Sequence, residues 1–193
     1  MLTRRAVWLP VAVLGLSACR PRSRTTSVAI DGPSAVGGPF QLVDADGHPV
    51  TEAVLKGKWT AVYFGYTYCP DVCPTTLQAL KEGLEKLGAR GKDVQSILIS
   101  VDPDHDTPAV MKAYVDNPGF PAGLKGFTGS VDQIKAAAKA YKVFYEKGPD
   151  GLVQHQSIIF LMDPQGRLAR PLTGEQSPSE IAAQIGDAMR QAS

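Results

Sequence analysis

TAVYFGYTYCPDVCPTTLQAL, spanning residues 60–80, predicts a strand, a loop and a helix in succession. Residues 60–64 are apolar or β-favouring without a polar break, which fits a buried central strand. Residues 65–74 contain a glycine, two prolines and two cysteines, which indicates a loop. Leucines then recur at a helical spacing, so we expect a helix over residues 75–87.

Outward from this segment, the chain alternates predicted strands and helices. We expect further strands at residues 40–43, 94–101, 143–145 and 157–162, and helices at residues 107–115, 130–141 and 177–192. Capping boxes open the last two of these helices. The pattern predicts an α/β fold with a mixed central β-sheet flanked by helices and an N-terminal hairpin. A cysteine pair at a strand-to-helix turn is the thioredoxin-like arrangement.

Cys69 and Cys73 are the residues of this segment that can carry chemistry. On a helical turn, positions four apart share one face, with Cβ atoms about 5–6 Å apart. Both sulfurs could then hold one metal ion or join as a disulfide. A purely structural disulfide is disfavoured because so short a loop gains little stability from closure. The helix dipole favours a thiolate at Cys73, whereas the charge of Asp71 opposes it, and the sequence leaves that balance open.

The first residues match an export signal rather than a folded element. Arg4 and Arg5 precede an apolar run, residues 6–16, that is shorter than the about 20 residues of a membrane span. The run ends in Leu-Ser-Ala and Cys19, which is similar to a bacterial lipobox. We predict a lipoprotein signal peptide at residues 1–18, lipidation of Cys19, a flexible membrane tether over residues 19–36 and one domain over residues 37–193. The alternatives are an ordinary signal, an uncleaved anchor or a twin-arginine signal.

The charge balance excludes one class of partner. The 193-residue chain has 20 Lys+Arg against 19 Asp+Glu, a formal net charge of +1. A protein that binds nucleic acid through a strongly basic surface would show a clear positive excess.

After lipidation of Cys19, two thiols would remain in an exported, oxidising compartment where disulfides persist.

Three stretches occur in a fixed order along the chain: FGYTYCPDVCP at residues 64–74, ISVDPDHDTP at residues 99–108, and His155 ahead of SIIFLMD at residues 157–163. Together they resemble the SCO/SenC family, thioredoxin-like copper-handling proteins of cytochrome c oxidase assembly. The likeness extends over about residues 36–190.

The resemblance implies that Cys69, Cys73 and His155 bind one copper ion. Two thiolates and an imidazole suit Cu(I) and can also hold Cu(II). No fourth Cys or His donor lies nearby in the sequence. A site with three ligands is open to a further donor, unlike a closed structural zinc site with four. One departure is that Gln154 and Gln156 flank the histidine, where the family usually has Asp before it and Ser or Thr after it. Losing an outer partner of a ligand typically costs about 10–100-fold in affinity or activity, so we expect this departure to bear on affinity.

Two functions follow from the resemblance. The first is a copper chaperone in the bacterial cell envelope, lipid-anchored and facing the periplasm, which delivers copper to the binuclear copper A centre of oxidase subunit II. Other periplasmic copper chaperones or thiol reductants would be its further partners. The second is a thiol–disulfide oxidoreductase in which Cys69 and Cys73 keep the subunit II cysteines reduced. The three-residue gap between the cysteines and the lack of proline at residues 154–157 disfavour an ordinary thioredoxin, and the residues before Cys69 disfavour a thiol peroxidase.

The remaining histidines are expected to have no direct role in metal binding. His48 follows a turn sequence, and His105 lies among three aspartates, Asp102, Asp104 and Asp106, that lack the EF-hand spacing of a calcium loop. We expect both histidines on polar loops. The tyrosines around the cysteine segment are expected to be packing residues.

Overall fold

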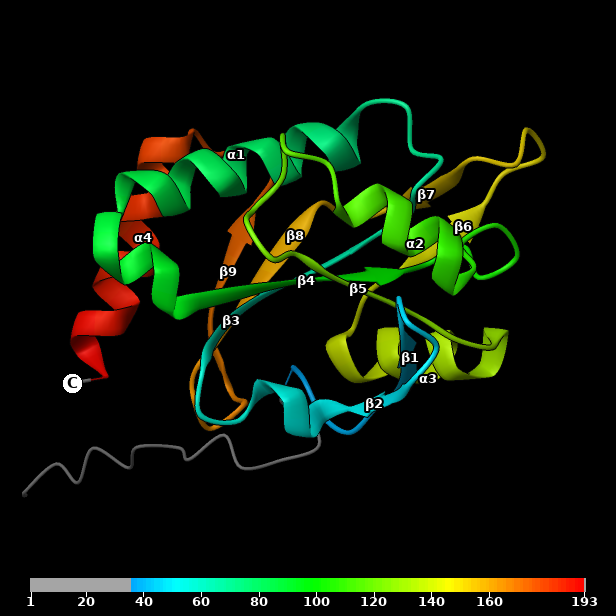
Figure 1. Cartoon of the computed structure of the whole chain (residues 1–193), viewed down its shortest axis with the longest axis horizontal. Helices are drawn as coiled ribbons and strands as arrows, with labels where there is room; N and C mark the ends of the chain where they lie inside the picture. The colour runs from blue at the N-terminus through cyan, green and yellow to red at the C-terminus, as the bar shows by residue number, and fades with distance from the viewer. Residues whose placement is uncertain (1–35, 193) are drawn as a thin grey trace, which may run out of the picture. The chain divides into compact units, whose positions relative to one another are not determined.

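The computed structural model describes residues 36–192, and the predicted signal peptide, Cys19 and most of the predicted tether lie outside this range. Its main sheet has seven strands in the order β2-β1-β5-β4-β3-β8-β9 (Figure 1). In chain order these strands are β1 (Gln41–Asp44), β2 (Pro49–Thr51), β3 (Trp59–Gly65), β4 (Val94–Ser100), β5 (Lys125–Thr128), β8 (Ile158–Met162) and β9 (Leu168–Thr173). A second sheet pairs β6 (Tyr145–Lys147) with β7 (Val153–His155).

β3 is an interior strand of the main sheet, and every residue after its first is buried. It runs parallel to β4 on one side and antiparallel to β8 on the other. β4 is parallel to β5, whereas β1 is antiparallel to both β5 and β2. The predicted mixed sheet and N-terminal hairpin are therefore confirmed.

Within the described part of the chain, four α-helices cover the sheet: α1 (Val72–Lys86), α2 (Pro108–Val115), α3 (Val131–Tyr141) and α4 (Pro178–Gln191). α1 packs against α4 on one face, and α3 lies on the other (Figure 1). Successive residues of a strand face opposite sides. Phe64 accordingly packs against Tyr141 of α3, with the rings tilted and their centroids 5.2 Å apart, while Tyr63 faces the α1 side. Both predicted capping boxes, at Ser130 and Ser177, are formed.

The helix after the cysteine loop begins earlier than predicted, and this changes the position of Cys73. α1 starts at Val72 rather than at residue 75, so Cys73 lies in the first helical turn. Pro74 fits there because the N–H groups of a first turn have no helical partner, and its missing donor costs nothing.

Three strands of three to six residues were not predicted, namely β5, β7 and β9, and the strand expected at residues 143–145 begins at Tyr145. β9 carries Pro171 at the outer edge of the sheet, where a missing N–H is tolerated. β7 carries His155 and pairs only with β6. No helix among the described residues is long and apolar enough to cross a membrane.

A substitution of Gly83 tests how closely α1 and α4 pack. A Cβ at this position would lie 2.8 Å from Cγ2 of Ile181 in α4. We expect Gly83→Ala to lower the free energy of unfolding by about 1–3 kcal/mol through overpacking, outweighing the roughly 1 kcal/mol that alanine gains in helix propensity. Chemical denaturation measures the change.

The control is Glu82→Ala, an exposed position of the same helix, which should change stability by less than about 0.5 kcal/mol. A Gly83→Ala variant more stable than the parent would show that the two helices have room to separate.

Candidate metal centre

The two cysteines occupy the turn after β3 and the first turn of α1. Cys69 is half-buried, whereas Cys73 is fully buried. The backbone N–H of Cys73 donates to Sγ of Cys69 over 3.3 Å, which draws both sulfurs to the same side of the turn. The two sulfurs are free thiols in this structure.

His155 approaches these sulfurs from the last position of β7. Its Nε2 lies 3.3 Å from Sγ of Cys73, and its Nδ1 lies 3.1 Å from the backbone oxygen of Gln156. A neutral imidazole that donates Nδ1–H to this carbonyl presents the lone pair of Nε2 to the sulfur. The ring is therefore oriented for coordination through Nε2.

Cys69, Cys73 and His155 form the one group of three Cys, His, Asp or Glu side chains within residues 36–192 whose geometry suits a metal ion. Their donor atoms all lie within 4.8 Å of one another. Ligand distances of about 2.0–2.3 Å to an ion the size of zinc place donors at such separations. Two sulfurs and one imidazole nitrogen form a soft donor set that suits Cu(I).

Burial sets the protonation state of the metal-free group. Loss of solvent is the largest influence on the Cys73 thiol and raises its pKa well above the ordinary value. The same cause lowers the pKa of His155. The balance between helix dipole and Asp71, left open by the sequence, is thus overridden by desolvation, and at neutral pH Cys73 carries its proton while His155 is neutral.

The glutamines beside His155 do not remove the bond that orients the ring. The side chain of Gln154 is exposed, and the partner of Nδ1 is the backbone carbonyl of Gln156, which any residue would supply. The outer partner of His155 is thus a backbone acceptor, which does not depend on the side chains at positions 154 and 156. For this reason the structure gives no support to the expectation that Gln154 and Gln156 lower the copper affinity by removing that partner.

Two tyrosines expected to be packing residues lie against the imidazole of His155. The rings of Tyr63 and Tyr66 each meet His155 edge-on, with centroids 5.9 Å apart in both pairs. Tyr66 also accepts a hydrogen bond through its hydroxyl oxygen from the N–H of Val153, over 3.2 Å. Tyr63 lies in the predicted strand and Tyr66 in the predicted loop, and their nearness to the cysteines along the chain was the only sequence signal for this role.

The group opens to the surface through a pocket of about 310 Å³. Its lining includes Tyr66, Cys69, Pro70, Leu152 and His155. An incoming donor atom can thus approach the half-buried Cys69, whereas Cys73 is fully buried and does not line this pocket.

The other histidines lie outside this group. His48 stands on the hairpin turn, 3.6 Å from a carboxylate oxygen of Asp44. His105 lies with Nδ1 2.6 Å from the carboxylate of Asp102. Cys19, the predicted lipid-bearing residue, is outside the described residues.

Comparison with known proteins places these features in a family. A sequence model of the SCO1/SenC family matches residues 28–190. The mitochondrial SCO1 homolog 1 of Arabidopsis thaliana is 44% identical over 149 residues, covering 72% of this chain and 44% of that protein. The chain spans about half the length of the curated relatives it matches first, 44–50%.

Solved structures of SCO1/SenC proteins also match this chain. Arabidopsis thaliana ScoI with copper bound matches with a TM-score of 0.77 and 39% identity, covering 81% of this chain and 99% of that one. A SCO1/SenC family lipoprotein from Bacillus anthracis matches with a TM-score of 0.69 and 30% identity, covering 82% and 96%. With its family match over most of its length and its Cys-Cys-His group, this chain belongs to the SCO1/SenC family.

Proposed function

We propose that this protein is a membrane-anchored periplasmic copper chaperone that binds one copper ion through Cys69, Cys73 and His155 and delivers it to the binuclear copper A centre of cytochrome c oxidase subunit II. The observation that carries the proposal is the convergence of two sulfurs and one imidazole nitrogen within 4.8 Å. The copper-bound state of the Arabidopsis neighbour supports copper as the cargo.

The unequal burial of the two sulfurs suits release of the cargo. Three ligands leave Cu(I) open to a further donor. A thiolate of the receiving protein would enter the pocket beside Tyr66 and Leu152 and meet the ion next to Cys69. Cys69, the more accessible sulfur, is then displaced first, while Cys73 and His155 hold the ion until a second incoming ligand replaces them.

The alternative function, a thiol–disulfide oxidoreductase acting on the subunit II cysteines, rests on the same two thiols. Their sulfurs lie close enough to react after a small rearrangement. Burial raises the pKa of Cys73, however, and a protonated thiol is a poor nucleophile, so attack on a partner disulfide would begin at Cys69. The metal role uses all three donors, whereas the redox role leaves His155 without a task.

Attachment to the bacterial cell envelope is proposed from the lipobox-like sequence that ends at Cys19. A family member from Bacillus anthracis is named a lipoprotein, which supports this placement, although other relatives are mitochondrial. Subunit II, further periplasmic copper chaperones and thiol reductants are the proposed partners. The near-neutral charge gives no basis for a nucleic-acid partner.

The reduced protein should bind one Cu(I). Cys69→Ala, Cys73→Ala and His155→Ala should each weaken binding by more than the roughly 10–100-fold that loss of an outer partner costs, because each removes a donor atom. Competition against a chromophoric Cu(I) chelator measures the affinity. His48→Ala is the matched control, since it removes an exposed histidine on the hairpin turn; variants that compete as well as the parent would refute the proposal.

Copper binding should tighten as pH rises. The Cys73 thiol is protonated at neutral pH because burial raises its pKa, so its proton must leave when the ion binds. His155 adds no proton above its ordinary pKa of 6.5, because burial lowers its pKa below that value. Calorimetry in buffers of different ionisation enthalpy should show a proton release that falls by about one in Cys73→Ala. An affinity independent of pH would contradict this account.

The mature protein should begin at a lipid-modified Cys19. Mass spectrometry of the N-terminal peptide should find the acyl chains, and Cys19→Ser should move the protein from the membrane fraction to the soluble fraction after export. Lys58→Ser, a substitution at an exposed position of the folded part, is the control and should leave the fractionation unchanged. An unmodified N-terminal peptide in the parent protein would exclude the lipid anchor.

A further inference from the structure

The loop between β4 and α2, residues 101–107, contains two buried aspartates that contact the two segments carrying the ligands of the metal centre. The side chain of Asp102 is 2% exposed, and Asp106 is 0% exposed. A buried carboxylate is costly unless charged or polar groups satisfy it. The partners of these two carboxylates therefore show what the loop holds in place.

Asp106 holds the cysteine segment. Its carboxylate accepts a hydrogen bond from the hydroxyl of Thr67 over 2.6 Å and from the backbone N–H of Thr67 over 3.2 Å. The hydroxyl of Ser100, at the end of β4, donates over 2.6 Å to the same oxygen, Oδ2, that accepts from the Thr67 N–H, while the Thr67 hydroxyl bonds Oδ1. Thr67 precedes Cys69 by two positions, so the turn that carries Cys69 is tied to the end of β4.

Asp102 holds the hairpin that carries His155. One carboxylate oxygen accepts from Nζ of Lys147 over 2.9 Å, and the other is 2.6 Å from Nδ1 of His105. Lys147 belongs to β6 and stands opposite Val153 of β7, two positions before His155. The ring of Tyr68 stacks on His105, with centroids 6.4 Å apart.

The hairpin needs such an attachment because β6 and β7 pair only with each other. No strand of the main sheet is their ladder partner within residues 36–192. Besides the contact of His155 with Cys73, the Lys147–Asp102 ion pair and the hydrogen bond from Val153 to Tyr66 join the paired strands to the loops around the cysteines. The contact with Asp104, 3.2 Å from Nζ of Lys147, is on an exposed carboxylate and adds little.

We infer that Lys147 and Asp102 are positioning residues of the metal centre: their ion pair sets the place of the β6–β7 hairpin and thereby holds His155 at the two thiols. The inference deepens the proposed copper-binding function and, for its effect on affinity, rests on it. The hydrogen bond to Asp102 also raises the pKa of Lys147, which keeps the ammonium charged. An ion pair with one partner almost fully buried is a specific anchor, because loss of the lysine leaves the carboxylate short of a partner.

A metal-free measurement tests the positioning role directly. In the reduced full-length chain without copper, Lys147→Met should raise amide hydrogen exchange in β6 and β7 roughly tenfold, because the hairpin loses its charged anchor. Exchange in β3 and β4 should not change. Lys147→Arg keeps a cation within reach of Asp102 and should restore protection.

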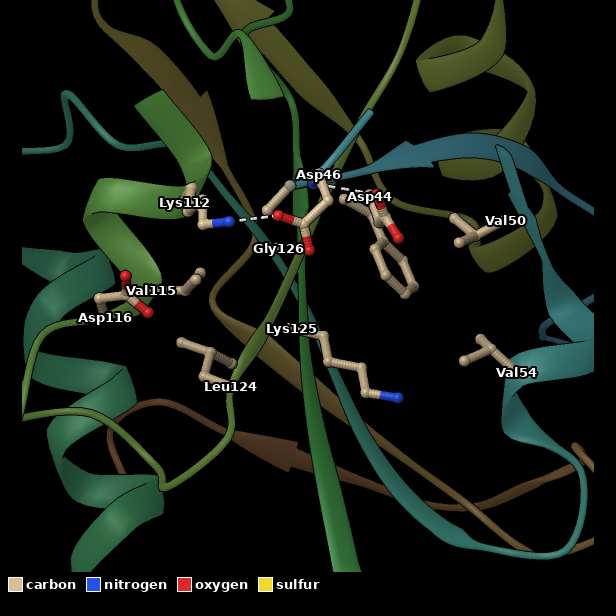
Figure 2. A pocket seen from close by; sticks show the side chains of 12 residues that line it. Asp44, Asp46, Val50, Val54, Lys112, Val115, Asp116, Leu124, Lys125 and Gly126 are labelled. Atoms are coloured by element: carbon tan, nitrogen blue, oxygen red, sulfur yellow. Dashed lines mark hydrogen bonds and ion pairs between the residues drawn. The ribbon is translucent and has the colours of Figure 1, made fainter. Parts of the chain in front are cut away.

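A second lysine–aspartate pair supplies the matched control. Lys112 of α2 contacts Asp46 beside a pocket of about 320 Å³ that contains no residue of the metal centre (Figure 2). Both side chains of this pair are exposed, 58% and 56%. Lys112→Met should leave exchange in β6 and β7 unchanged. Equal exchange in Lys147→Met and Lys112→Met would overturn the inference, whatever the protein does with copper.

A double-mutant cycle separates positioning from general stability. Lys147→Met should weaken Cu(I) binding roughly tenfold in the parent protein, as loss of an outer partner does. In a His155→Ala background the same substitution should have no effect on affinity, because the hairpin then carries no ligand. An equal loss in both backgrounds would show a merely structural role and refute the inference. If the parent chain binds no Cu(I), the proposed function fails, and the exchange measurement alone decides the role of Lys147.

Discussion

The contact between Sγ of Cys73 and Nε2 of His155 is the interaction on which the site depends, since it joins residues 82 positions apart at 3.3 Å. Strand pairing produces it. β8 runs antiparallel beside β3, with Tyr63 opposite Ile159, so β8 begins at the edge of the sheet where β3 ends. The cysteine segment leaves β3 at that edge, and the chain enters β8 just after His155. A slip of one residue in this register would turn Tyr63 to the opposite face and separate the donors.

Exclusion of water then determines the charge of the group. Burial keeps the proton on Cys73 and keeps His155 neutral, so the metal-free centre avoids an uncompensated charge inside the fold. Tyr63 and Tyr66 contribute to this exclusion, because their rings cover two sides of the imidazole. A cation that displaces the thiol protons offsets negative charge on the thiolates. Burial therefore makes Cys73 a poor nucleophile, but it does not prevent Cys73 from acting as a metal ligand.

The rigidity of the centre is uneven. Cys73 is part of a helix that packs on the central sheet, and Cys69 is tied through Thr67 to Asp106. His155 instead belongs to a small sheet of two strands, which has marginal stability alone. The two cysteines are therefore attached to the main fold, whereas the place of the histidine depends on how the β6–β7 hairpin is anchored.

The sequence by itself determined the elements whose signals are local: the buried strand at residues 60–64, the N-terminal hairpin, and the helices that open at Ser130 and Ser177. It also showed which soft donors the chain possesses, and the resemblance grouped Cys69, Cys73 and His155. Only the tertiary structure decided that β7 is a strand, that a backbone carbonyl orients His155, that desolvation outweighs the helix dipole at Cys73, and that Lys147 reaches Asp102. The physical reason is that hydrogen-bond partners and solvent exclusion depend on distances in space between segments far apart in the chain, whereas periodicity and capping act over a few neighbouring residues.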